Sequence, residues 1–299
     1  MTDSLEVWRF VDGKPGHENQ SLGLVKALAE HVELRLHDIS VEKGVHNLLN
    51  LLLGRCPQGP ASQPDLLIGA GHATHLPMLA CRRACGGRIV VLMKPSLPRR
   101  WFDLCIVPQH DGLAETDRVL VTQGVINPVQ AATKLADAPV LVLLGGPSGE
   151  YAWNEQQLFE QVRAIVAAAT GSVLVVGSRR TPGSTLERLH SGLSGAARVL
   201  AQSDTEAGWL ASQLPHTKEV WVSEDSVSMV YEALTAAAAC GLLAVPLKKT
   251  GRVSQGVRSL VQQGFVTTFD AWQKGAPLAV PEQPFNEAQR AAHWVLQHV

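Results

Sequence analysis

Polar side chains able to bind anions and move protons crowd the nine residues Asp12–Gln20, directly after the apolar run Val7–Val11. A helix cap needs one polar side chain, so this density favours a binding site over a simple cap. Two glycines allow close approach of the backbone to a ligand. We expect Asp12 or His17 to act as a general base, with substrate contacts from Gly13, Lys14, Gly16, Asn19 and Gln20.

A second segment of this kind, Ser223–Met229, follows the strand candidate Val220–Val222. Amides at the start of a helix attract a phosphate, so this turn suits a nucleotide diphosphate. Its candidate contacts are Ser223, Glu224, Asp225, Ser226, Ser228 and Met229. Glu232, in the first turns of the expected helix, could accept hydrogen bonds from a ribose diol.

Further candidates lie at the ends of other apolar runs. They are Gly71 and His72, Lys94, Gly145 and Gly146, Ser178 and Arg179, and Lys248 and Arg252. His72 is a second candidate base, the glycine amides could meet a phosphate, and Arg179 or Arg180 could hold one by a bidentate contact. Each motif alone is more often a solvated loop, but their recurrence at successive strand ends favours a nucleotide site. The chain has no Walker A pattern, and Gly69-Ala70-Gly71 lacks the third glycine of a dinucleotide fingerprint.

Short apolar runs alternate with helical stretches along the whole chain, which predicts an α/β fold with doubly wound parallel sheets. The predicted strands are 7–11, 34–36, 66–68, 89–93, 104–107, 119–121, 140–144, 173–176, 198–200, 220–222 and 242–245. Predicted helices include Ser21–Glu30, Leu158–Ala169 and Val227–Ala239. We expect two Rossmann-like domains facing each other across a cleft, residues 1–130 and 131–284, with a linker at Pro277–Pro284. Residues 285–299 form an amphipathic helix that could dock back on the first domain.

The net charge of −1 gives no basic field for nucleic acid. The chain shows neither a signal peptide pattern nor an apolar run long enough to span a membrane. Five cysteines without pairing or zinc spacing predict reduced, structural thiols and hence the cytosol. Leu97–Phe102 mixes cations with aromatics, which suits peripheral contact with the inner face of a membrane. The same segment could equally start a buried strand.

The motifs Asp12–Gln20, Gly145–Ser148 and Ser223–Met229 resemble those of the mitochondrial-fission "elongated mitochondria" family, whose bacterial members are regarded as glycosyltransferases. The resemblance runs over nearly the whole chain. It implies a GT-B fold, with the nucleotide-sugar donor mostly on the C-terminal domain and the acceptor on the N-terminal one. It also implies catalysis without a metal or other cofactor, in keeping with the lack of an Asp-x-Asp motif. By the resemblance, Glu232 takes the place of a ribose-binding glutamate and Ser226 and Ser228 lie at the diphosphate.

The leading hypothesis is a glycosyltransferase that moves a sugar from a nucleotide diphosphate to a lipid-linked or oligosaccharide acceptor. Arg179, Lys248 and the amides around Ser226 would stabilise the leaving diphosphate. A nucleotide-sugar epimerase of the same architecture is the enzyme alternative. A third alternative is a non-catalytic adaptor at a membrane surface, because plant relatives are known for a role in organelle division.

Overall fold

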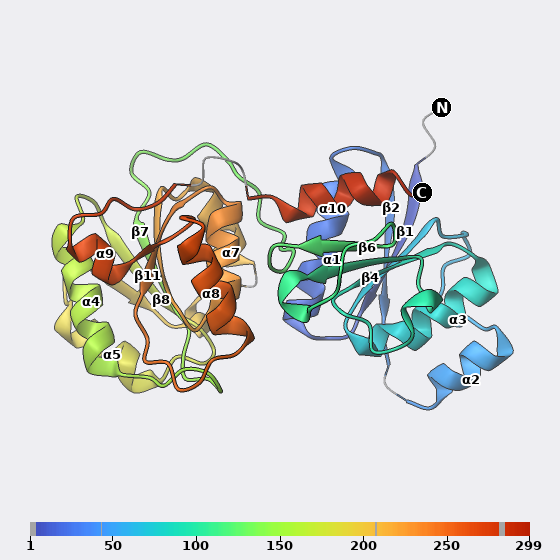
Figure 1. Ribbon diagram of the computed structural model, residues 1–299, viewed down its shortest axis with the longest axis horizontal. Helices are drawn as coiled ribbons and strands as arrows, with labels where there is room; N and C mark the ends of the chain where they lie inside the picture. Colours follow the sequence, from blue (N-terminus) through green and yellow to red (C-terminus); the bar gives the residue numbers. More distant parts are fainter. Residues whose placement is uncertain (1–3, 43, 207, 281–284) are drawn as a thin grey trace. The chain divides into compact units, whose positions relative to one another are not determined.

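The computed structural model describes residues 4–42, 44–206, 208–280 and 285–299. The chain divides into two compact units, one formed by Met1–Pro128 with Asn286–Val299 and the other by Val129–Phe285. Each unit is built on one six-stranded parallel sheet with helices on both faces, as Figure 1 shows. The sheets confirm the predicted α/β class with two Rossmann-like domains. The predicted boundaries, residues 130 and 284, lie within two residues of these divisions.

The sheet of unit 1 has the strand order β2-β1-β3-β4-β5-β6. Its strands are β1 (Leu5–Val11), β2 (Leu34–Ser40), β3 (Leu66–Ala70), β4 (Arg88–Leu92), β5 (Leu104–Pro108) and β6 (Val119–Thr122). Helix α1 (Pro15–Ala29) and the terminal helix α10 (Glu287–Leu296) pack on one face. Helix α3 (His75–Cys85) packs on the other face, and α2 (His46–Leu53) lies beside α3. Three 3-10 turns, His72–Thr74, Arg99–Trp101 and Gln109–Asp111, follow β3, β4 and β5.

Helix α10 belongs to the core of unit 1 although it is far from α1 in sequence. Ala291, Ala292 and Val295 are fully buried, in the same apolar cluster as Leu24 and Leu28 of α1. Small alanine side chains let the two helices approach closely. Asn286 caps the helix by accepting a hydrogen bond from the amide of Gln289.

The sheet of unit 2 has the order β12-β11-β10-β7-β8-β9. Its strands are β7 (Val140–Leu144), β8 (Val173–Gly177), β9 (Arg198–Leu200), β10 (Glu219–Ser223), β11 (Ala239–Leu243) and β12 (Thr267–Thr268). One face carries α7 (Val227–Thr235), α8 (Arg252–Gln262) and α6 (Trp209–Gln213). The other carries α4 (Glu155–Ala168), α5 (Gly183–Gly192) and α9 (Phe269–Gln273). The 3-10 turns Gln202–Asp204 and Leu214–His216 complete the unit.

The predicted helix Val227–Ala239 is too long. Helix α7 ends at Thr235, and β11 already begins at Ala239. Ala237 has a φ of 56°, a left-handed conformation that stops the helix and turns the chain into the strand. The alanine-rich sequence favours a helix by local propensity, and the pairing of β11 with β10 overrides it. The predicted linker Pro277–Pro284 lies partly outside the described residues, at 281–284.

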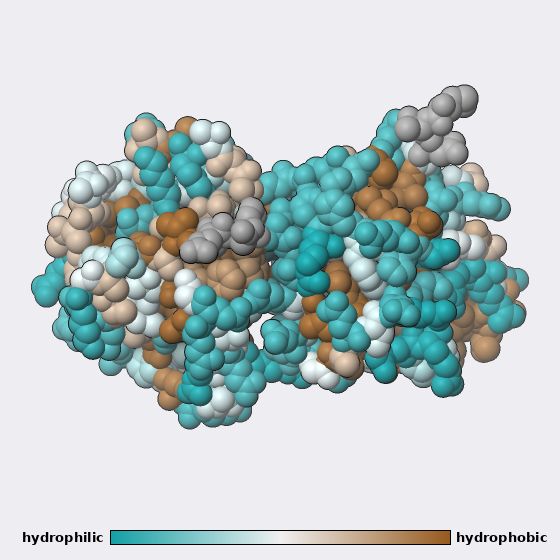
Figure 2. Space-filling model, turned by 45° about the horizontal axis from the view of Figure 1, so that its top comes forward, coloured by the Kyte–Doolittle hydropathy of each residue, from teal (hydrophilic) through white to brown (hydrophobic). Residues whose placement is uncertain are grey.

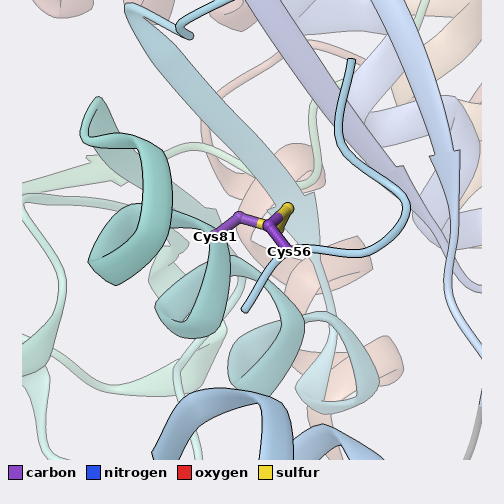
Figure 3. The surroundings of a disulfide bond; sticks show 2 residues. All are labelled: Cys56 and Cys81. Carbon is purple, nitrogen blue, oxygen red and sulfur yellow. A yellow bond between two sulfur atoms is a disulfide. The ribbon is translucent and has the colours of Figure 1, made fainter. Parts of the chain in front are cut away.

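The prediction of five reduced cysteines is wrong, because Cys56 and Cys81 form a disulfide (Figure 3). Cys56 lies in the loop after α2 and Cys81 on α3, and the packing of α2 on α3 brings their Cα atoms within 4.7 Å. Their separation of 25 residues matches no local motif. Reduced thiols were the basis for expecting the cytosol, so that expectation loses its support. Among the described residues, no helix has both the length and the apolar character needed to cross a membrane.

Candidate functional site

Two of the polar segments of unit 1 meet where the sheet changes winding direction. Strands β1 and β3 are neighbours, β2 lies beyond β1, and β4 lies beyond β3. The helices that follow β1 and β3 therefore leave toward opposite faces, and the carboxyl ends of strands at such a switch point are where α/β proteins bind ligands. The segments Asp12–Gln20 and Gly71–His72 both begin at this edge.

Asp12 and His17 form a hydrogen-bonded pair at this edge. The Nδ1 of His17 lies 2.9 Å from Oδ2 of Asp12, whose side chain is only 1% exposed. The Lys14 amide donates to the other carboxylate oxygen at 3.2 Å. Gly13, with a φ of 76°, turns the chain so that α1 starts at Pro15 and carries His17 back over the carboxylate. With Nδ1 held by Asp12, Nε2 is left to take a proton.

Gly71 makes the room in which the His17 ring lies. A Cβ on Gly71 would come within 2.2 Å of Cε1 and 2.4 Å of Nδ1 of His17. Gly71 also has φ 78° and ψ 162°, a region open almost only to glycine. The structure thus brings together Asp12, His17 and Gly71 from two separate motifs, and gives Gly71 a steric role toward the imidazole.

The other candidates of unit 1 divide between internal contacts and exposure. Gln20 is buried and its side-chain amide donates to the Gly16 carbonyl of its own helix, so this donor is used within the motif. Lys94 donates to the Asp111 carbonyl at 3.2 Å. Asn19 and His72 are exposed. Lys14 is also exposed, with Nζ 3.8 Å from the Asp12 carboxylate.

His75, which belongs to the same sequence motif as His72 but not to the candidate site residues, is buried near this edge. Burial lowers the pKa of His75 to about 4, so the ring is neutral at physiological pH. The Ser96 hydroxyl lies 3.2 Å from its Nδ1, and the Phe102 ring packs against it. These contacts give His75 a packing role beneath the edge that carries His72.

In unit 2, the amides of Gly145 and Gly146 are not available to a phosphate, and that expectation is wrong. The Gly145 amide donates to the Ser223 hydroxyl at 2.7 Å, and the Gly146 amide donates to the Asp225 carboxylate at 2.8 Å. A Cβ on Gly145 would lie 2.0 Å from that carboxylate. These glycines therefore let the ends of β7 and β10, neighbours at the switch point of this sheet, approach each other.

Arg180, not Arg179, fastens this strand end. Its guanidinium pairs with the Asp225 carboxylate at 2.8 Å and donates to the Gly146 carbonyl at 2.7 Å. Ser178 donates its hydroxyl to the Gly145 carbonyl, so it too is used within the fold. Arg179 is exposed and has no partner in the described part of the chain, which leaves its charge available to a ligand. Nothing in the sequence separates the roles of these two adjacent arginines.

The start of α7 keeps backbone amides that are not used within the described part of the chain. Ser226 is its N-cap, and the Ser226 carbonyl accepts from the amides of Met229 and Val230. The amides of Val227 and Ser228 have no acceptor within the described residues. Ser228 is exposed, and the predicted contact Met229 packs partly against the apolar core. Helix starts with unpaired amides carry partial positive charge.

The carboxylates around this helix differ in their surroundings. Glu224 accepts from the Val245 amide, and burial raises the pKa of Glu224. Glu232 is half-buried, and burial raises the pKa of its carboxyl to about 7. The backbone carbonyl of Glu232 accepts from the Ala236 amide, but its side-chain carboxyl has no hydrogen-bond partner among the described residues. A carboxylate in that position lacks the hydrogen bonds that a diol ligand would supply.

The start of α8 is already occupied from within the chain. The Glu150 carboxylate accepts from the amides of Val253 and Ser254, at 3.2 and 2.9 Å. Sequence reasoning missed Glu150, because no motif links it to residues more than a hundred positions later. Lys248 and Arg252 are exposed beside this occupied helix start. Of the two helix starts, α7 is therefore the one with amides left for a ligand.

The chain belongs to the mitochondrial fission ELM1 family, whose model matches residues 15–299. This confirms the resemblance inferred from the motifs. No curated protein matched the chain.

Solved structures with the GT-B fold resemble the chain over most of its length. A proposed UDP-N-acetylglucosamine 2-epimerase from Listeria monocytogenes has a TM-score of 0.57 and 14% identity, covering 98% of this chain and 95% of that one. The UDP-GlcNAc 2-epimerase from Neisseria meningitidis, bound to UDP-GlcNAc, has a TM-score of 0.50 and 10% identity, covering 98% and 99%. The E. coli ADP-heptose LPS heptosyltransferase II has a TM-score of 0.50 and 10% identity, covering 87% and 99%. At these identities the similarity establishes the fold, which glycosyltransferases and epimerases share.

Proposed function

We propose that the protein is a glycosyltransferase that moves a sugar from a nucleotide diphosphate to a hydroxyl of a lipid-linked or oligosaccharide acceptor. The observation that carries this proposal is the His17–Asp12 pair at the switch point of unit 1. Nε2 of His17 takes the acceptor proton while the acceptor oxygen bonds to the anomeric carbon and the bond to the diphosphate breaks. The buried Asp12 carboxylate stabilises the imidazolium that forms.

The donor nucleotide binds to unit 2 in this proposal. The amides of Val227 and Ser228, which have no acceptor within the described residues, donate hydrogen bonds to the diphosphate, and Arg179 and Lys248 place positive charge beside the leaving group. The Glu232 carboxylate accepts hydrogen bonds from the ribose hydroxyls, and its side chain has no other hydrogen-bond partner among the described residues. These groups neutralise the leaving diphosphate without a metal ion, so EDTA should leave turnover unchanged.

A panel of UDP, GDP, CMP and ADP sugars tests the proposal, with thermal shift for binding and chromatography for hydrolysis or transfer. Binding raises the melting temperature by mass action. His17→Ala should lower turnover by about 100-fold or more and leave donor binding intact. His190→Ala, an exposed histidine on α5, is the matched control. His72→Ala tests the other candidate base.

Three results would overturn the proposal in different ways. Failure to bind any nucleotide sugar would exclude both the glycosyltransferase and the epimerase and would favour an adaptor. Formation of an epimeric nucleotide sugar from donor alone assigns the fold to an epimerase. Full turnover of His17→Ala rejects the base assignment.

A further inference from the structure

Helix α2 turns its apolar side outward. Val45, Leu48, Leu49, Leu52 and Leu53 are 91, 51, 55, 63 and 51% exposed. Their spacing of i, i+3, i+4, i+7 and i+8 is the stripe that usually faces a protein core. Here the stripe faces away from unit 1, and apolar surface is visible at the right-hand edge of Figure 2, where α2 lies in Figure 1.

The polar side of the same helix faces the protein. His46, Asn47 and Asn50 line a cavity of about 320 Å³ that also borders Phe10 and Cys81. Among the residues of α2, Leu51 is the one that packs on the core of this face. The orientation is thus the reverse of that expected for a helix whose apolar stripe is buried within the domain.

Helix α2 is nevertheless firmly attached. The Cys56–Cys81 disulfide ties the loop at its end to α3, as Figure 3 shows. Arg83 of α3 packs at its C-terminus, within 3.3 Å of the place of a Cβ on Gly54. The exposed leucines therefore sit on a fixed part of the domain.

Exposed arginines lie at the end of α2 and on a turn that adjoins the same apolar cluster as Leu51. Arg55 follows the helix and Arg83 lies against its end. The turn Arg99–Trp101, which follows β4, carries two exposed arginines and a tryptophan that is 38% exposed. The next residue after this turn, Phe102, is buried in the apolar cluster that contains residues of α3. Asp103 forms an ion pair with Arg82 of α3. Glu42 is an exposed carboxylate that borders the same cavity.

We propose that α2 is an interfacial helix that inserts its leucine face into a bilayer containing anionic lipids. An exposed apolar helix face with the arginines Arg55 and Arg83 at its end matches the acyl boundary and the anionic headgroups above it. The proposal depends only on this surface and not on the proposed glycosyl transfer. Since the loop before α2 leaves the sheet beside Asp12, at the paired residues Val11 and Ser40, the membrane would lie near the proposed base.

Sedimentation with vesicles tests the proposal. The full chain, with its disulfide intact, should bind vesicles of phosphatidylcholine and phosphatidylglycerol and bind weakly to phosphatidylcholine alone. The double variant Leu49→Asn and Leu52→Asn should have an affinity for these vesicles lower by about tenfold or more. The double variant Leu135→Asn and Val280→Asn is the control, because these residues are similarly exposed, 50 and 61%, but lie in unit 2.

Charge and self-association complete the test. Arg55→Glu with Arg83→Glu should remove the preference for anionic vesicles. All substitutions are at exposed positions, and thermal unfolding checks that each variant is folded. Equal binding by the α2 variant and its control overturns the proposal, as does failure of the native chain to bind either vesicle. A lipid-free dimer that the α2 variant abolishes would overturn it too, by assigning the leucine face to a second copy.

Discussion

Replacing Gly71 by alanine should displace His17 and stop the proposed reaction. The Cβ would lie 2.2 Å from Cε1 of His17, whereas unbonded carbons rest at about 3.5–4.0 Å. The ring must therefore move by about 1.3 Å or more to restore that spacing. Such a movement breaks the 2.9 Å hydrogen bond to Asp12. A misplacement of this size costs about 100-fold in rate.

The same substitution also strains the backbone, and Gly86 separates the two effects. Gly71 has φ 78° and ψ 162°, and Gly86 has φ 84° and ψ −153°, so alanine at either position costs about 1–3 kcal/mol. A Cβ on Gly86, however, meets nothing within 4 Å. Gly86→Ala should therefore lose comparable backbone stability and keep its activity.

The assays are urea unfolding, sugar transfer and the proton spectrum of the histidine rings. The proton on Nδ1 of His17, which the hydrogen bond to Asp12 protects from exchange, should give a signal in the native protein and in Gly86→Ala. This signal should be absent in Gly71→Ala. Adding His17→Ala to Gly71→Ala should recover part of the lost stability, since the overlap disappears. Equal activity and equal ring spectra for the two glycine variants would refute the steric role of Gly71.

Further predictions concern unit 2 and the disulfide. Arg180→Ala should lower the free energy of unfolding, measured in urea, by about 1–3 kcal/mol because Asp225 loses its charged partner. Arg179→Ala should leave the free energy of unfolding unchanged and weaken nucleotide binding, measured by calorimetry. Burial raises the pKa of Glu232 from 4.5 to about 7 in the folded protein. The contribution of this carboxyl to the free energy of unfolding is therefore greatest below pH 4.5 and is lost as the pH rises through 7. Glu232→Gln should remove this dependence, and native nucleotide affinity should increase from pH 6 to pH 8; identical profiles would contradict the assignment. Cys56→Ser should lower the free energy of unfolding by about 3 kcal/mol, because the disulfide closes a loop between residues separated by 25 positions. Cys85→Ser should lower it far less, because Cys85 is a free thiol.

The sequence by itself determined the fold class, the family and every described strand except the two-residue β12. Apolar runs such as Val140–Leu144 appear as strands because a parallel sheet covered on both faces needs continuous apolar segments. The sequence also placed Asp12 and His17 in one motif as alternative candidate bases, and a contact between them is local because they are five positions apart across a glycine turn. In these cases the determining interactions are local or depend on pattern alone.

Only the tertiary structure decided which polar groups are left for a ligand. Gly145 and Gly146 look like phosphate-binding glycines, but their amides are bonded to side chains 78 and 79 positions away. The disulfide and the outward stripe of α2 depend likewise on how α2 packs against α3. A polar residue's availability is set by the partners that folding brings to it, and those partners are distant in sequence. The pattern of residues therefore predicts where ligands can bind, and the packing of the chain determines which groups remain to bind them.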